Sequence, residues 1–317
     1  MKIGITGGFG FIGSNLATHL INKNYNLVLI DDLSTGIKSN LNNLNSNFHK
    51  ISITDLEQCT NALKGCDVIV HLAARGSVPR SLKNPIATHE INSTGTLNML
   101  EIARKNNSHF IYSSSSSVYG ANDAIPKNEK MWLAPKTPYA ASKLSAESYV
   151  QSYGYSYDVP VTNLRFFNVF GPKQRPNHQY AAVVPKWIWK AINAQTIDIH
   201  GDGKQTRDFT FVGTVVDIIE QAITNKVLTK SAVNVAYGNN ISLLEVVEQI
   251  KKYFPNLTYN FLEPRVGDIK NSQNDPALVQ ELFPSVQPID FSIGLEKTIN
   301  WLKGENLDSK PLNLDLE

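Results

Sequence analysis

The sequence predicts an α/β protein with a Rossmann-like, doubly wound parallel sheet and a smaller, discontinuous C-terminal lobe. Three observations support this prediction. Short apolar runs alternate with helical patterns through the first half of the chain, as in repeated β-α-β units. A glycine-rich turn directly follows the first apolar run. After Asn168 the pattern loosens into a stretch rich in proline, glycine and asparagine, which indicates that the chain leaves the sheet.

The apolar runs predict buried strands over residues 2–6, 26–30, 68–71, 110–113 and 161–165. Strands buried on both faces of a parallel sheet have this continuous apolar character. Apolar residues at helical spacing predict helices over 15–22, 91–106 and 139–154.

Two later segments, 209–212 and 233–235, look like strands that return to the first domain. We therefore expect a nucleotide-binding domain over 1–168 with returning segments over about 206–236. The remaining residues, about 169–205 and 237–317, would form the smaller lobe, at the carboxyl edge of the sheet where ligands bind in open α/β folds.

The composition excludes several classes of protein. The 317 residues hold 30 Lys and Arg against 28 Asp and Glu, so the balance of charge does not indicate a nucleic-acid partner. We expect neither export nor a membrane span, because the N-terminus lacks a signal-peptide pattern and no apolar run is long enough. The two cysteines, Cys59 and Cys66, fit neither a metal site nor a secreted disulfide scaffold. We expect a cytoplasmic protein with reduced thiols and no metal.

The glycine-rich turn predicts a dinucleotide site. Gly7, Gly10 and Gly13 lie between the first strand and the first helix, where glycines let backbone amides approach a pyrophosphate. Asp31 ends the second strand, and its carboxylate suits ribose hydroxyls; Asp32 could share that role. The carboxylate would repel a 2′-phosphate, and no Arg or Lys follows immediately. These features favour NAD over NADP.

Tyr139 and Lys143 indicate chemistry at that cofactor. They stand four residues apart in a predicted helix, so both side chains lie on one face. A positive charge ~5 Å from a phenol, at an effective dielectric constant of ~20, favours its ionised form by roughly 3 kcal/mol. We therefore expect Lys143 to lower the pKa of Tyr139 by about two units. The positive ring of the oxidised nicotinamide would supply the rest and make Tyr139 a base near neutral pH.

The chain contains the glycine turn, a run of five serines from Ser113 to Ser117, and the Tyr139-Lys143 pair. With these features it resembles an extended short-chain dehydrogenase/reductase of the NAD-dependent epimerase/dehydratase family. Matching motifs run from Thr6 to Ser272, which is nearly the whole chain. By resemblance, further residues contact the cofactor besides the glycines and the two aspartates. They are Phe11, Ile12, Asp55, Leu56, Leu72, Ala73, Ala74, Asn92, Tyr139, Lys143 and Phe166.

The resemblance also implies a reaction. The run Ser113 to Ser117, followed by Val-Tyr-Gly, resembles the strand end of UDP-hexose 4-epimerases, and their catalytic hydroxyl corresponds to Ser115. The related 4,6-dehydratases carry an Asp-Glu pair where this chain has Ser116 and Ser117, so dehydration lacks its acid and base. The implied cycle has Tyr139 take the proton of the sugar 4-hydroxyl while hydride moves to NAD. The resulting 4-keto sugar is then reduced on its opposite face.

Within this group the chain is most similar to UDP-N-acetylglucosamine 4-epimerases. Small residues would leave room for an acetamido group, and arginines would clamp the diphosphate. The implied substrate residues are Gly76, Ser77, Ser115, Ser116, Ser117, Asn168, Ala182, Val183, Arg207, Arg265, Asp268 and Ser272. Such a pocket would also admit UDP-glucose and UDP-galactose.

Alternatives stay open. Arg75 departs from the family pattern, so a uronic acid sugar is one alternative, and a net UDP-sugar reductase or dehydratase is another. A catalytically silent NAD-binding scaffold belongs to a different class, since a fold does not prove a function. The family resemblance further implies a homodimer built on helices 91–106 and 139–154.

Overall fold

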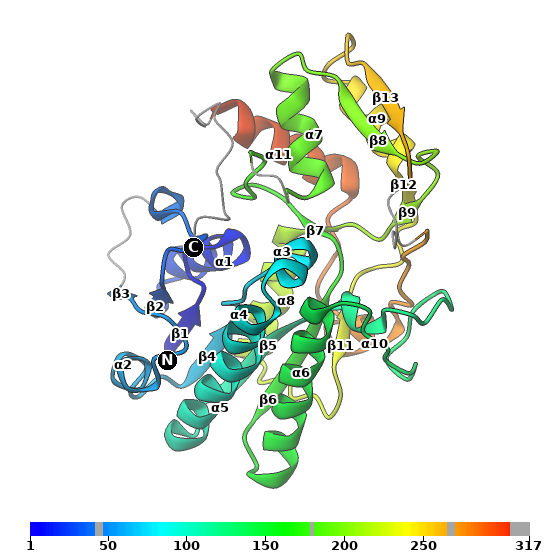
Figure 1. The fold of residues 1–317 in the computed structure, drawn as a ribbon. Helices are drawn as coiled ribbons and strands as arrows, with labels where there is room; N and C mark the ends of the chain where they lie inside the picture. Colours follow the sequence, from blue (N-terminus) through cyan, green and yellow to red (C-terminus); the bar gives the residue numbers. More distant parts are fainter. Residues whose placement is uncertain (42–46, 178–180, 265–269, 305–317) are drawn as a thin grey trace.

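The computed structural model describes residues 1–41, 47–177, 181–264 and 270–304. A seven-stranded parallel sheet forms its centre (Figure 1), in the order β11-β6-β5-β4-β1-β2-β3. The strands are β1 (Lys2–Thr6), β2 (Asn26–Asp31), β3 (Asn47–Lys50), β4 (Val68–His71), β5 (His109–Ser115), β6 (Val161–Phe166) and β11 (Val233–Val235). This arrangement confirms the predicted fold class.

Both faces of the sheet are buried, because alternate residues of each strand enter separate apolar cores. In β2, Leu27 and Leu29 belong to one core, whereas Val28 and Ile30 belong to the other. The first core includes residues of α1 (Phe11–Asn22) and α8 (Val212–Thr224). The second includes residues of α2 (Leu56–Ala62), α5 (Gly95–Asn106) and α6 (Pro138–Ser156). The continuous apolar runs of the sequence follow from this double burial.

Most predicted elements are present, with three differences. The strand β3 is not predicted, because Phe48 is its one apolar residue and none of its residues is fully buried. The strand predicted over 209–212 is wrong in part. Only β10 (Thr210–Phe211) is extended, and it pairs with β7 (Val169–Phe170) outside the main sheet. The chain turns into α8 at Val212, whose apolar side packs in the first core. The helix predicted over 91–106 begins as a π-helical turn (Glu90–Thr94) before α5.

The remaining elements extend beyond one end of the sheet. The helix α7 (Val183–Ile192), the parallel pair β8 (Ile197–His200) and β13 (Tyr259–Leu262), and α9 (Leu243–Lys251) are grouped there (Figure 1). The short pair β9 (Thr206–Arg207) and β12 (Ile241–Ser242) is antiparallel. The last helices are α10 (Ala277–Leu282) and α11 (Phe291–Gly304). The division of the chain into two lobes at the stated boundaries stays a prediction.

Short helices and turns complete the description. They are α3 (Val78–Lys83), α4 (Pro85–His89) and two 3-10 turns, Lys38–Leu41 and Ser116–Tyr119. In the part of the chain that the structure describes, no helix is both long and apolar enough to cross a membrane.

Candidate active site

The carboxyl ends of five adjacent strands open into one cavity of about 790 Å³. Its wall includes one residue at or just after the end of each strand: Gly7 after β1, Asp31 in β2, Leu72 after β4, Ser115 in β5 and Phe166 in β6. A pocket at this edge of an open parallel sheet is the expected ligand site of the fold.

The glycine turn brings backbone close to backbone at the start of α1. Gly7 has φ of +70°, and a Cβ there would lie 2.8 Å from the Ala73 amide nitrogen. A Cβ on Gly13 would lie 2.1 Å from the Gly7 carbonyl oxygen, so only glycine lets α1 begin this close to the turn. The first N–H groups of a helix lack intrahelical acceptors, and Phe11, Ile12 and Gly13 line the cavity. The first turn of α1 holds no acidic residue. This arrangement fits the pyrophosphate of a dinucleotide.

Asp31 supports the same turn. Its carboxylate accepts the Phe9 amide at 2.9 Å and the Leu33 amide at 2.8 Å. Burial raises the pKa of Asp31, and these backbone hydrogen bonds oppose the rise. Each carboxylate oxygen keeps further acceptor capacity, and Asp31 and Asp32 both line the cavity. The residues at the end of β2 therefore fit the ribose hydroxyls of the cofactor.

Tyr139, Lys143 and Ser115 meet on the wall of the cavity. Tyr139 is half-buried, and its side chain forms a hydrogen bond with Ser115. Lys143, on the next turn of α6, donates from Nζ to the Ser113 carbonyl at 2.7 Å and lies 5.0 Å from the centre of the Tyr112 ring. A phenol, a hydroxyl and an amine are thus assembled from α6 and the end of β5.

The electrostatics of this group correct one expectation. The pKa of Tyr139 is raised, not lowered: burial raises it, and the hydrogen bond with Ser115 opposes the rise. Burial also lowers the pKa of Lys143 to about 7. The prediction of a lowered Tyr139 pKa is therefore wrong for this structure, because burial outweighs the effects that favour the phenolate.

Many residues predicted to bind ligands line the cavity. They are Gly7, Gly10, Phe11, Ile12, Gly13, Asp31, Asp32, Leu72, Ala73, Ala74, Gly76, Ser77, Ser115, Tyr139, Lys143, Phe166, Asn168 and Ala182. Arg265 and Asp268 lie outside the described residues.

Other predicted residues are elsewhere or have structural partners. Asp55 caps α2 by accepting the Gln58 amide at 2.9 Å, and Leu56 follows it. The adjoining cavity wall is made instead by Ile51 and Ile53, which the sequence prediction missed because isolated isoleucines carry no motif.

Asn92 is buried behind the wall. Its side chain accepts the Arg75 amide at 2.7 Å and donates to Ser142 Oγ at 2.9 Å, so it orders the loop after β4. Five more predicted residues, Ser116, Ser117, Val183, Arg207 and Ser272, do not line the cavity. Their assignment as substrate residues stays a prediction.

Four cationic side chains on the cavity wall were not assigned to substrate binding: Arg75, Arg80, Lys173 and Arg175. The Nε atoms of Arg75 and Arg175 are buried and have no hydrogen-bond partner among the described residues. Lys173 donates to Thr18 Oγ1 at 2.8 Å. Cationic groups in a cavity favour an anionic ligand. The sequence signal for two of them was their position directly after Gly171-Pro172.

A possible metal-ligand group lies apart from the cavity. His19, Asp217 and Glu220 approach one another on α1 and α8. The Lys23 ammonium already binds Glu220 at 2.6 and 2.7 Å, and His19 Nε2 lies 2.8 Å from the same carboxylate. These contacts explain the group as an ion-pair cluster between two helices.

Comparisons with known proteins agree with the fold and the cavity. The family model described as "NAD dependent epimerase/dehydratase family" matches residues 3–236. A putative UDP-glucose 4-epimerase of Methanocaldococcus jannaschii is 34% identical over 309 residues, which cover 95% of this chain and 98% of the relative.

Two solved structures show the same likeness. A UDP-N-acetylglucosamine 4-epimerase of Methanobrevibacter ruminantium, in complex with UDP-N-acetylmuramic acid, has a TM-score of 0.88 and 35% identity, covering 95% of this chain and 98% of that one. A UDP-glucose 4-epimerase of Thermotoga maritima with UDP-glucose has a TM-score of 0.89 and 30% identity, covering 96% and 99%.

Proposed function

The chain belongs to the NAD dependent epimerase/dehydratase family, and we propose that within it the protein is a UDP-sugar 4-epimerase. We propose UDP-N-acetylglucosamine and UDP-N-acetylgalactosamine as its principal pair, with UDP-glucose and UDP-galactose as further substrates. The observation that carries the proposal is that Ser115, Tyr139 and Lys143 line the same cavity as the glycine turn.

The three side chains have distinct roles in this proposal. Tyr139 exchanges its proton with the sugar 4-hydroxyl, since it is the phenol among the three and its side chain forms a hydrogen bond with Ser115. Ser115 donates a hydrogen bond to the same sugar oxygen and holds it against Tyr139. Lys143, when charged, favours the phenolate of Tyr139. When bound, NAD takes up a hydride from the sugar and returns it.

The preference for the acetylated sugar rests on open space near the reacting residues. A Cβ added at Gly76 would meet no atom within 4 Å among the described residues, and Ala182 is the other small side chain of this wall. Space for the larger group supports this preference over the smaller sugars.

A second candidate substrate is a UDP-uronate, which the Arg75 side chain favours. Its Nε is buried at the cavity wall without a partner among the described residues, and a guanidinium pairs well with a carboxylate. The C6 carboxylate of a uronic acid would supply that partner.

The experiment that tests the proposal is incubation of the purified protein with UDP-N-acetylglucosamine, UDP-glucose and UDP-glucuronate in separate reactions. The C4 epimers are then separated by ion-pair chromatography and identified by NMR. We expect UDP-N-acetylgalactosamine to form without added cofactor, and Tyr139→Phe to abolish it. The ratio of rates ranks the three sugars.

The other classes predict different results. A net reductase or dehydratase would leave the bound cofactor reduced after one turnover, or release a product that has lost water. A silent scaffold would retain NAD but convert none of the three sugars. Either result would overturn the epimerase proposal.

We also propose a cytoplasmic homodimer. The helix α6 carries exposed aromatic residues, Tyr155 at 70% and Tyr149 at 41% exposure, and a second copy would cover them. Cys59 and Cys66 are buried free thiols, and burial raises the pKa of Cys66 to about 11, which suits a reducing compartment. Light scattering after gel filtration would measure the mass of the particle, and that of a monomer would refute the dimer.

A further inference from the structure

We propose that Glu147 is a positioning residue for the epimerase reaction: its buried carboxylate holds Lys143 in the charged form and fastens the end of β5 to α6. This inference rests on the proposed function only for its kinetic consequence. The effect of Glu147 on the pKa of Lys143 can be measured without substrate.

The first observation is that residues along one face of α6 contact successive residues at the end of β5. Tyr139, Lys143 and Glu147 follow one another at four-residue spacing along α6, so they share a face. Each contacts a different residue of the serine run that ends β5. Tyr139 bonds with the Ser115 side chain, Lys143 donates to the Ser113 carbonyl at 2.7 Å, and Ser114 Oγ donates to Glu147 Oε2 at 2.5 Å.

The second observation is that Glu147 is fixed from the other side by Arg165 of β6. Arg165 Nε donates to Glu147 Oε2 at 3.0 Å, and its terminal nitrogen donates to Oε1 at 2.5 Å. Both side chains are buried, with 1% and 4% exposure. A bidentate pair of this kind fixes the orientation of both groups.

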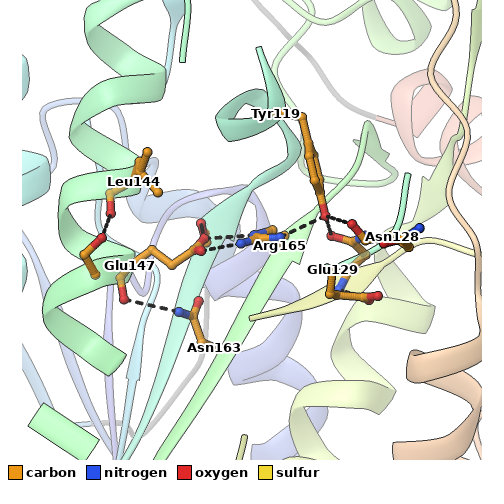
Figure 2. Close-up of polar contacts among 10 residues, drawn as sticks. Tyr119, Asn128, Glu129, Leu144, Glu147, Asn163 and Arg165 are labelled. Atoms are coloured by element: carbon orange, nitrogen blue, oxygen red, sulfur yellow. Dashed lines mark hydrogen bonds and ion pairs between the residues drawn. The ribbon is translucent and has the colours of Figure 1, made fainter. Parts of the chain in front are cut away.

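Arg165 is in turn held in place by Tyr119. It donates to the Tyr119 hydroxyl at 2.8 Å, and that hydroxyl donates to Asn234 Oδ1 at 2.8 Å. Figure 2 shows Glu147 and Arg165 pointing toward each other, with Tyr119 and Asn128 beyond the guanidinium. The carboxylate of Glu147 therefore has little freedom to move from its place beside Ser114 and Arg165.

The third observation is the surroundings of Lys143. Its ammonium donates to the Ser113 carbonyl and lies 5.0 Å from the centre of the Tyr112 ring of β5. Tyr139 and Glu147 lie one turn away on either side along α6. The Lys143 charge and burial lower the pKa of His71 of β4. Glu147 is the acidic side chain nearest to Lys143 along α6, and Arg165 is the cation paired with Glu147. Burial lowers the pKa of Lys143 to about 7, and the Glu147 charge opposes that fall.

Loss of the Glu147 charge changes the protonation of Lys143. A lysine is charged below its pKa, so removing the Glu147 charge lowers that pKa and leaves Lys143 neutral at neutral pH. Neutral Lys143 no longer favours the phenolate of Tyr139. The decline of activity on the alkaline side then moves to lower pH.

The test compares Glu147→Gln with the wild-type full-length protein. Lysines are labelled with ¹³C at Cε, the Lys143 signal is assigned with Lys143→Met, and its pKa is read from an NMR titration. We expect the Lys143 pKa to fall by about one pH unit. The alkaline limb of the kcat profile, measured on the UDP-sugar that the enzyme converts, should move in the same direction, while KM changes less than kcat. An unchanged Lys143 pKa would overturn the proposal.

Two further variants separate the charge from simple structural support. Glu147→Gln with Arg165→Met removes both charges, so it avoids an unpaired buried guanidinium. We expect this double variant to recover thermal stability but to keep a lowered Lys143 pKa. If Glu147→Gln does not fold, the double variant still tests the proposal, since a wild-type Lys143 pKa in it would refute the proposal.

Glu101→Gln is the matched control. Glu101 also pairs with an arginine, Arg104, and accepts the Tyr153 hydroxyl of α6, but its charge does not act on Lys143. Its loss should leave the Lys143 titration unchanged, and an equal fall of the Lys143 pKa in this control would also contradict a specific role for Glu147.

Discussion

The close approach of α1 to the glycine turn makes Gly13→Ala an informative substitution. Alanine is favoured over glycine by about 1 kcal/mol in a helix interior, so helix propensity alone predicts a more stable protein. The structure predicts the reverse. The new Cβ would lie 2.1 Å from the Gly7 carbonyl oxygen and 3.0 Å from Gly8 Cα.

The size of the expected loss of stability depends on how firmly the Gly7 carbonyl is held. Ordinary van der Waals contact begins at 3.4 Å, so the two atoms must separate by about 1 Å. The Gly7 oxygen cannot move freely, because it accepts the Gly10 amide at 3.1 Å, and the Gly7 amide donates to Ile30 at 2.8 Å. Overpacking typically costs about 1–3 kcal/mol. We expect a net loss of about 2 kcal/mol in the free energy of unfolding, and a Tm lower by about 3 °C. A 1 Å displacement of the turn should weaken NAD binding by about 10–100-fold.

The assays are thermal unfolding of the NAD-free protein and titration with NAD by calorimetry. Gly304→Ala is the control, since it makes the same substitution in α11 with no described atom within 4 Å of the added Cβ. The control should be neutral or slightly stabilising. If Gly13→Ala matches the control in Tm and binds NAD as the wild type does, the steric reasoning is refuted.

Three further outcomes are expected. Tyr139→Phe should lower kcat by about 10²–10⁴-fold while NAD remains bound, as measured by epimer formation and cofactor absorbance; a smaller loss would place the proton exchange elsewhere. Gly76→Leu should fill the open space at the cavity and lower the ratio of UDP-N-acetylglucosamine to UDP-glucose turnover by about tenfold, and an unchanged ratio would contradict this placement of the acetamido group. Burial lowers the pKa of His109 from 6.5 to about 4, so the unfolded chain takes up its proton first. The free energy of unfolding should therefore fall between pH 6.5 and 4, by up to about 1.4 kcal/mol per pH unit, and His109→Gln should show a shallower fall in urea unfolding across that range.

Much of the fold follows from local patterns. The continuous apolar runs of β1, β2, β4, β5 and β6 identify buried strands because both faces of the sheet are covered. The glycine turn and the Tyr139-Lys143 pair are equally local, since a turn and one helix face are set by residues close in sequence. The strand β3 is not predicted because a single apolar residue, Phe48, makes no apolar run in this partly exposed edge strand.

The chemistry of the site depends on contacts between distant parts of the chain. The sequence placed Lys143 beside Tyr139, but only the packing of α6 against β5 directs its ammonium to the Ser113 carbonyl and desolvates it. In the same way, Asn92 has a role only because its helix lies against both Arg75 and Ser142. Glu147 belongs to no local motif that the sequence reading used. It meets Arg165 because α6 packs against β6.

The sequence by itself thus determined the α/β class, the glycine turn and the family of the chain, because periodicity and short motifs record local geometry and burial. The tertiary structure decided which charges face one another and which groups lose water. Those quantities depend on strand order and helix packing, and they set the pKa values on which the proposed proton exchange depends.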